Sequence, residues 1–231
     1  MTMDRVHRDP TGFPMLWVES LGAYVHWAPV TKIQFEHFIC DAGDRAFDLR
    51  WYETVMALNP RLAPGKLTIA NYWQAFASGI LPVEAQRFAF WCGKGYRLPS
   101  AEHWRLAYRE LASLPLEDLD APDLWTGGDG AASPPLSPRA RQLLQRLEEA
   151  AASAATTMGY SRRLADQMLL RLGVLEWVTD QDRWGGMGEP FPAFCGNLAA
   201  PERDAPILPW NAESERLACF GFRLLYDGAP R

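Results

Sequence analysis

Several features that mark exported, membrane or nucleic-acid-binding proteins are missing from this sequence. It has no apolar run of about eighteen residues, so we expect no membrane-spanning helix. The first residues, MTMDRVHRDPTG, are polar and include no apolar signal core, which predicts a cytoplasmic location. The net charge is -5, and lysine and arginine form no dense cluster. We therefore expect neither nucleic acid nor a membrane as a partner.

Cysteine and histidine are scarce, with four residues of each. They are Cys40, Cys92, Cys195 and Cys219, and His7, His26, His37 and His103. The cysteines are widely spaced and form no C-x-x-C pair, so we expect free thiols, most of them buried. No two histidines are separated by three or four residues, so a histidine cluster that holds iron is not expected.

Large apolar side chains are plentiful. Hydrophobic residues make up 48% of the chain and charged residues 22%, which is typical of a globular protein with ample material for a core. Ten tryptophans are present and aromatic residues reach 12%. Such a composition favours an irregular, loop-rich core. No repeat or linker interrupts the chain, so we predict a single domain over residues 1–231.

The first third of the chain alternates between strand and helix signals. Residues 13–30 predict a hairpin that turns at Ser20–Gly22. Thr31 and Gln34 form a capping box at the start of a short helix that ends near Gly43. Residues 45–70 carry many turn signals, and we predict an irregular surface excursion there.

Two further amphipathic helices follow. Pro82 precedes the first, which ends at Gly93 and buries the stripe Ala85, Phe88, Ala89 and Cys92. The second lies in YRLPSAEHWRLAYREL, where Ser100 occupies the N-cap position and Glu102 complements the helix dipole. Its predicted buried stripe is Trp104, Ala107, Tyr108 and Leu111.

The second half of the chain begins with a loop-plus-helix insertion at residues 113–160. Its helix starts at Ser137-Pro138 and carries the apolar stripe Leu143, Leu144, Leu147, Ala150 and Ala151. A short helix is predicted over 162–172 and a strand with the buried acid Glu176 over 173–180. Residues 181–215 are mainly turn-formers and large rings, and 219–227 predict a single terminal strand.

Four blocks in this order carry a family resemblance. They are PVTKIQFEHF (29–38), VEAQRFAFWCGKGYRLPSAEHWRLAYRE (83–110), GVLEWVTD (173–180) and FGFRLLYD (220–227). Together they resemble the sulfatase-modifying-factor domain, the family of the formylglycine-generating enzymes. The resemblance implies an α+β fold, an elaborated and loop-rich form of the C-type-lectin-like fold. Fold alone does not imply chemistry.

The resemblance also implies where catalytic residues would stand. Catalytic members oxidise a substrate cysteine with two closely spaced copper-binding cysteines near the C-terminus, whereas Cys195 and Cys219 lie far apart. Cys195 is the one candidate catalytic thiol, for an alternative function as a copper- or iron-dependent oxidoreductase acting on a cysteine or thiol. Calcium, which some members hold beside the E-W strand, is a second alternative cofactor. Glu176 is the candidate metal ligand, but Leu169 stands where the family has an oxygen ligand. We expect Glu176 to be a structural acid bonded to backbone amides, and the chain to need no cofactor.

The same resemblance places a binding surface in the loops before the last strand. The candidate ligand-binding residues are Trp184, Met187, Phe191, Phe194, Asn197, Trp210 and Asn211. Rings next to asparagine are typical of adaptable protein-binding surfaces, although about half of these rings could form the loop's own core. The sequence therefore favours a non-catalytic module, a pseudoenzyme that binds a protein or peptide. Two further hypotheses are that the chain works inside a larger bacterial multi-protein assembly, and that it is a variable protein diversified by a retroelement.

Overall fold

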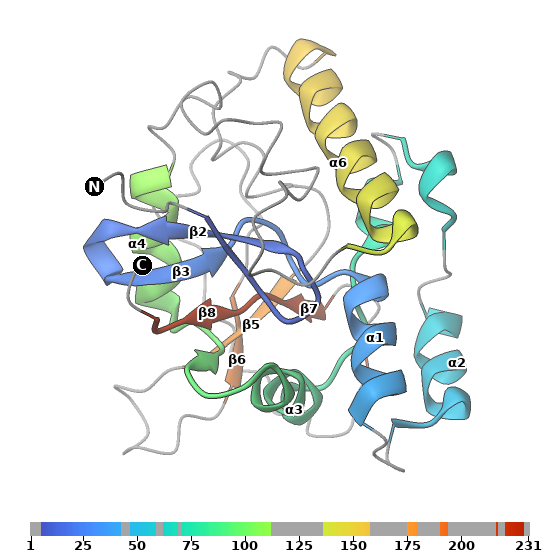
Figure 1. Ribbon diagram of the computed structural model, residues 1–231, viewed down its shortest axis with the longest axis horizontal. Helices are drawn as coiled ribbons and strands as arrows, with labels where there is room; N and C mark the ends of the chain where they lie inside the picture. Colours follow the sequence, from blue (N-terminus) through green and yellow to red (C-terminus); the bar gives the residue numbers. More distant parts are fainter. Residues whose placement is uncertain are drawn as a thin grey trace.

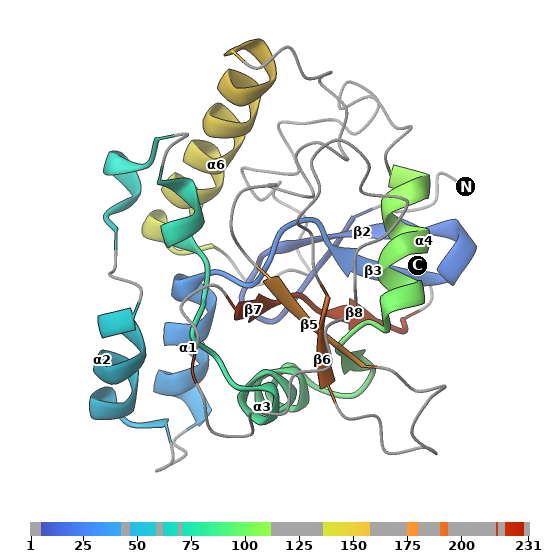
Figure 2. The same ribbon diagram turned by 180° about the vertical axis from the view of Figure 1, so that it is seen from behind.

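The fold is α+β, with a five-stranded sheet, a three-stranded sheet and helices around them (Figures 1 and 2). The structure, a computed structural model, describes residues 6–42, 47–58, 62–68, 71–111, 136–157, 175–179, 190–193, 216 and 220–228. No helix in these ranges is long and apolar enough to cross a membrane. Of the predicted loop over 113–137, residues 113–135 lie outside these ranges, as does the predicted helix over 162–172.

The larger sheet is antiparallel and has the order β1-β2-β3-β8-β4. Its strands are β1 (Val6–Arg8), β2 (Pro14–Val18), β3 (Ala23–His26), β8 (Leu225–Tyr226) and β4 (Tyr96–Arg97). The hairpin predicted over 13–30 is confirmed as the pair β2 and β3. Its turn needs Gly22, because the backbone φ there is +58°, in the left-handed region.

The smaller sheet has the order β6-β5-β7, with β6 (Pro190–Ala193), β5 (Leu175–Thr179) and β7 (Phe220–Phe222). β5 pairs with β6 in antiparallel and with β7 in parallel orientation. The prolines of β6 lie at the end of this order, where a missing backbone N–H is tolerated. The strand predicted around Glu176 is thus confirmed, whereas β6 was not predicted.

The prediction of a single terminal strand is wrong, because that segment divides between the two sheets. β7 ends at Phe222, and β8 begins at Leu225 in the larger sheet. Between them, the Arg223 side chain turns into the interior and the Leu224 N–H donates to a side chain, His26 Nδ1, at 3.2 Å. Two residues that belong to neither strand therefore separate β7 from β8.

The main helices are α1 (Lys32–Ala42), α2 (Leu49–Leu58), α3 (Pro82–Cys92), α4 (Ala101–Leu111) and α6 (Pro138–Thr157). In both views α1 and α2 lie at one end of the molecule and α4 at the other (Figures 1 and 2). The short 3₁₀ helices are η1 (Glu19–Leu21), η3 (Pro64–Lys66) and η4 (Tyr72–Ala75).

The predicted helix starts are confirmed by their caps. The Thr31 N–H donates to Gln34 Oε1 at 2.8 Å, and the Gln34 N–H donates to Thr31 Oγ1 at 3.3 Å. Ser100 Oγ accepts from the His103 N–H at 3.1 Å. Ser137 Oγ accepts from the Ala140 N–H at 3.1 Å. Each cap satisfies an amide that the first turn of the helix leaves without a partner.

The prediction of an irregular excursion over 45–70 is wrong where α2 lies. The Asp48 carboxylate accepts from the Trp51 N–H at 2.7 Å and caps the helix. Tyr52 and Val55 then supply its buried side. The sequence pattern does not reveal this helix, because its buried side is narrow and the turn signals Asn59-Pro60 and Pro64-Gly65 follow closely.

Two groups of buried side chains make up the described core. One lies around Phe35, Phe88 and Phe222, between α1, α3 and the sheets. The other includes Val25 and Trp27 of the larger sheet region together with α6 side chains. Leu143, Leu144 and Leu147 are buried as predicted, so α6 packs on the same core as the sheet. The side chains of Tyr108, Ala150 and Ala151 lie outside the described part.

Candidate functional site

The binding residues predicted from the sequence lie almost entirely outside the described ranges. Phe191 belongs to β6, where the structure describes only the backbone. Trp184, Met187, Phe194, Asn197, Trp210 and Asn211 fall outside the described residues, as do Cys195, Cys219 and Leu169. These predictions therefore remain predictions.

The structure does describe the two strands between which that loop segment runs. β5 and β7 are neighbours, with Leu175 opposite Phe220 and Trp177 opposite Phe222. Trp177 is 2% exposed and Phe222 is fully buried. The Trp177 indole N–H also donates to the Ile80 carbonyl at 2.7 Å. Residues 180–219 thus connect β5 to β7, and buried side chains hold both of these strands in the core.

Glu176 is buried and forms an ion pair with Arg223. The Arg223 Nε and Nη2 atoms donate to the two carboxylate oxygens at 2.5 and 2.6 Å. The Trp104 indole N–H donates to Glu176 at 3.3 Å. Arg223 Nη1 also donates to the carbonyl oxygens of His26 and Trp27. Both side chains are 1% exposed, so the pair is desolvated as well as bidentate.

This geometry gives Glu176 partners that the sequence did not predict. We expected backbone amides, and the structure shows that a guanidinium and an indole N–H donate to its carboxylate. The guanidinium already supplies a positive charge to both oxygens. A calcium ion at Glu176 would have to displace it, so the arrangement does not fit calcium there.

A second buried carboxylate, Asp9, organises the region where β2, β3 and α1 meet. Its Oδ1 accepts from the Thr11 N–H and hydroxyl, at 2.8 and 2.5 Å, and from the Phe13 N–H at 3.0 Å. Its Oδ2 lies 3.0 Å from His26 Nε2 and accepts from Gln34 Nε2 at 2.8 Å. Burial by itself raises the pKa of Asp9, but His26, Thr11 and Phe13 outweigh that effect and lower the pKa below 3.8.

The hydrogen bonds around His26 assign its tautomer. His26 Nδ1 accepts from the Leu224 N–H at 3.2 Å, so it carries no hydrogen. Nε2 then holds the hydrogen and donates it to Asp9. His26 therefore links the Asp9 carboxylate to the junction of β7 and β8.

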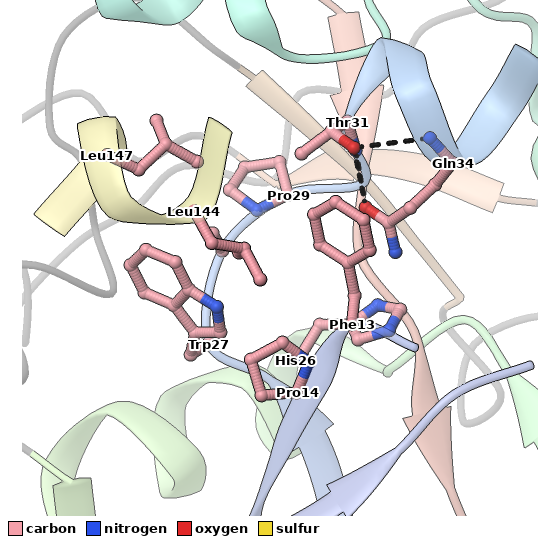
Figure 3. A pocket seen from close by; sticks show the side chains of 10 residues that line it. Phe13, Pro14, His26, Trp27, Pro29, Thr31, Gln34, Leu144 and Leu147 are labelled. Carbon is pink, nitrogen blue, oxygen red and sulfur yellow. Dashed lines mark hydrogen bonds between the residues drawn. The ribbon is translucent and has the colours of Figure 1, made fainter. Parts of the chain in front are cut away.

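A small cavity lies against this network (Figure 3). It measures about 10 Å³, enough for roughly one water molecule. Phe13, Trp27 and Leu144 contribute apolar walls, while His26 and Gln34 contribute polar atoms (Figure 3). The cavity is too small to hold an organic substrate.

A larger cleft of about 350 Å³ opens between α1 and the first turn of α6. Phe13, Ile33 and Ala140 line its apolar side. Its polar side includes Glu36, His37, Cys40 and Arg139. Arg139 Nη1 donates to Glu36 Oε2 at 2.9 Å, and the Tyr52 hydroxyl donates to Glu36 Oε1 at 2.9 Å. The volume lies within the range of ligand pockets, roughly 300–1,000 Å³.

The described cysteines differ in environment. Cys92 is buried in the core, where burial and the nearby Asp9 charge raise the pKa of its thiol, so the thiol stays protonated and unreactive. Cys40 is a free, exposed thiol at the cleft. Within the described residues, no three histidine, cysteine or acidic side chains are arranged to hold a metal ion.

Sequence reasoning did not identify Asp9, His26 or the α1–α6 cleft. Asp9 did carry a signal, because the run Asp-Pro-Thr-Gly is typical of a turn in which an aspartate bonds to the backbone ahead of it. The cleft carried no such signal, because residues 43–137 separate its two helices in the sequence.

Comparison with known families identifies the scaffold. A family model described as sulfatase-modifying factor enzyme 1-like domain matches residues 11–227. Comparisons with curated proteins and with solved structures find no significant match. The matched range contains all four sequence blocks, including Glu176 and Arg223. The chain therefore belongs to the family of sulfatase-modifying factor enzyme 1-like domains.

Proposed function

We propose that this chain is a non-catalytic member of its family that binds a protein or peptide through its C-terminal loops. The binding residues in this proposal are those named from the sequence, between Trp184 and Asn211. The scaffold beneath them would be a C-type-lectin-like arrangement, in which irregular loops before the last strand form the binding surface.

The observation that supports this proposal best is the anchoring of the loop segment. The strands on either side of residues 180–219 pair with each other, and their side chains Trp177 and Phe222 are buried. The Glu176–Arg223 ion pair ties β5 to the residue that follows β7. Binding loops are commonly carried in this way on a rigid scaffold.

Two side chains of catalytic types in the described residues serve the scaffold. Glu176 is paired with Arg223, and Cys92 is buried with a protonated thiol. These groups serve the scaffold and do not supply a nucleophile or a metal ligand. Oxidation by Cys195 with copper or iron is the alternative function, and it is decided by experiment.

The binding surface can be tested with a photocrosslinking amino acid in the full chain. We would place p-benzoylphenylalanine at position 194 or 210 and, as a matched control, at position 90, where Phe90 is 87% exposed on α3. We expect positions 194 and 210 to capture the same partner from the native host, and position 90 not to capture it. With the purified partner, Trp210→Ala and Phe194→Ala should weaken binding about tenfold or more, and Phe90→Ala should not.

Two results would contradict the proposal. One is a partner that binds all three alanine variants as tightly as the unchanged chain. The other is copper- or iron-dependent oxidation of a cysteine-containing peptide that disappears in Cys195→Ser. A reverse transcriptase gene and a near-copy of the coding segment for the loops, beside this gene, would identify a retroelement-diversified ligand-binding protein.

A further inference from the structure

The cleft between α1 and α6 is a second place where this chain could hold a ligand, and it involves no residue of the 181–219 loops. In both views the start of α6 lies next to α1 (Figures 1 and 2). The cleft measures about 350 Å³ and has distinct apolar and polar sides. We propose that it binds a small monocarboxylate with a short apolar body. This site is independent of the proposed function.

The positive charge in the cleft comes from Arg139. Its side chain is 37% exposed, and Nη1 donates to Glu36. A guanidinium carries five N–H donors in a planar fork, so the atoms beyond Nη1 can donate to a carboxylate. Arg139 is also in the first turn of the 20-residue helix α6, where the helix dipole favours an anion.

The apolar side of the cleft gives room for the ligand's body. Phe13 and Ala140 are buried in the core and present a fixed wall, with Ile33 packed against them. Gln34 and Thr11 line the same cleft and are held by Asp9. This support by a buried carboxylate keeps the wall in one arrangement before a ligand arrives, which lowers the entropic cost of binding.

Substitutions at Glu36 and Arg139 should change the affinity for a carboxylate in opposite directions. Its carboxylate pairs with Arg139 and accepts from Tyr52, but it still places negative charge near the incoming anion. Glu36→Gln removes this negative charge and should therefore strengthen carboxylate binding. The glutamine oxygen can still accept from Tyr52, so the local structure is kept. Arg139→Gln should weaken it. If the ion pair were merely structural, both substitutions would have the same effect.

Binding can be measured on the full chain with benzoate and its neutral isostere benzamide. Titrations followed by ligand-observed NMR should give a dissociation constant for benzoate at least about tenfold lower than for benzamide, since one charge-assisted bond is lost. Arg139→Gln should remove that preference. Arg146→Gln is the matched control, because Arg146 is also an exposed α6 arginine paired with a glutamate, Glu149.

Cys40 reports whether the ligand occupies this cleft. Its thiol is exposed and lines the cavity, so bound benzoate should slow its alkylation by iodoacetamide, measured by mass spectrometry. Preference for benzoate, protection of Cys40 and opposite effects of the two cleft substitutions would support the proposal. The proposal would be overturned if benzamide bound as tightly as benzoate, if benzoate did not protect Cys40, or if no binding were seen at millimolar benzoate. It would also be overturned if the two cleft substitutions changed the affinity in the same direction.

Discussion

Among the carboxylates that the structure describes, those of Asp9 and Glu176 have the least exposed surface, at 0% and 1%. An isolated buried charge is costly, so each must be compensated where it lies. Asp9 is compensated by hydrogen bonds from several neutral groups, and Glu176 by a guanidinium.

Stability should depend on the ionisation of Asp9. Its pKa in the folded chain is below 3.8, whereas in the unfolded chain it returns to about that value. The ionised carboxylate therefore stabilises the fold fully above its unfolded pKa, and this contribution is lost as pH falls through the folded pKa. Asp9→Asn should lower the free energy of unfolding at pH 7 by about 2–4 kcal/mol, measured by urea denaturation.

Urea denaturation repeated at several pH values distinguishes this ionisation effect from a general loss of packing. The deficit of Asp9→Asn should shrink as pH falls below 3.8, because the unchanged chain then loses the same interaction. Asp41→Asn is the control, since Asp41 is exposed and accepts from Trp91 at the surface. A deficit that stays constant with pH would contradict the assignment to ionised Asp9.

At the scale of elements, helices with a cap and a wide buried stripe were predictable from the sequence. α1, α3, α4 and the start of α6 all have a capping signal followed by apolar residues at helical spacing. α2 has a cap at Asp48, but its buried side is narrow, and neighbouring turn signals concealed it. The division of the last strand was not predictable, because Arg223 turns inward toward Glu176 on β5 and toward carbonyls next to β3.

The Glu176–Arg223 pair should couple β5 to the junction of β7 and β8. Arg223→Met and Glu176→Gln should each lower the free energy of unfolding by about 3–5 kcal/mol, because each leaves the other group without its partner. In a double-mutant cycle by urea unfolding, the double variant should lose much less than the sum of the two.

The chain offers a surface pair for comparison. Arg97 and Asp227 also form a bidentate pair, but they are 32% and 45% exposed. Arg97→Met should therefore lower the free energy of unfolding by less than about 1 kcal/mol. Additive losses in the Glu176–Arg223 cycle would show that the two residues act separately.

At the scale of the whole molecule, the helix α6 belongs to the core. Ala140, Leu144 and Leu147 are in the same buried group as Val25 and Trp27. The family blocks predicted the scaffold correctly, and the sequence pattern predicted α6. The α1–α6 cleft depends on how two remote helices meet, so no local pattern could reveal it.

Removing side-chain volume from α6 tests its place in the core. Leu144 is fully buried, so Leu144→Ala should lower the free energy of unfolding by about 2–5 kcal/mol in urea denaturation. Gln145→Ala, on the exposed side of the same helix, should change it by less than about 0.5 kcal/mol. A loss below about 1 kcal/mol for Leu144→Ala would indicate that α6 is a separable appendage.

The position of β8 has a consequence for synthesis of the chain on the ribosome. β3 pairs on one side with β2, its neighbour in sequence, and on the other with β8, where Tyr24 lies opposite Tyr226 and Val25 opposite Leu225. Until residues 225–226 leave the exit tunnel, that side of β3 has backbone donors and acceptors open to any other strand. Full-length chains tethered to the ribosome by a linker too short to bring Leu225 out of the tunnel should therefore bind chaperones that recognise exposed strands, and a linker long enough to bring it out should release them.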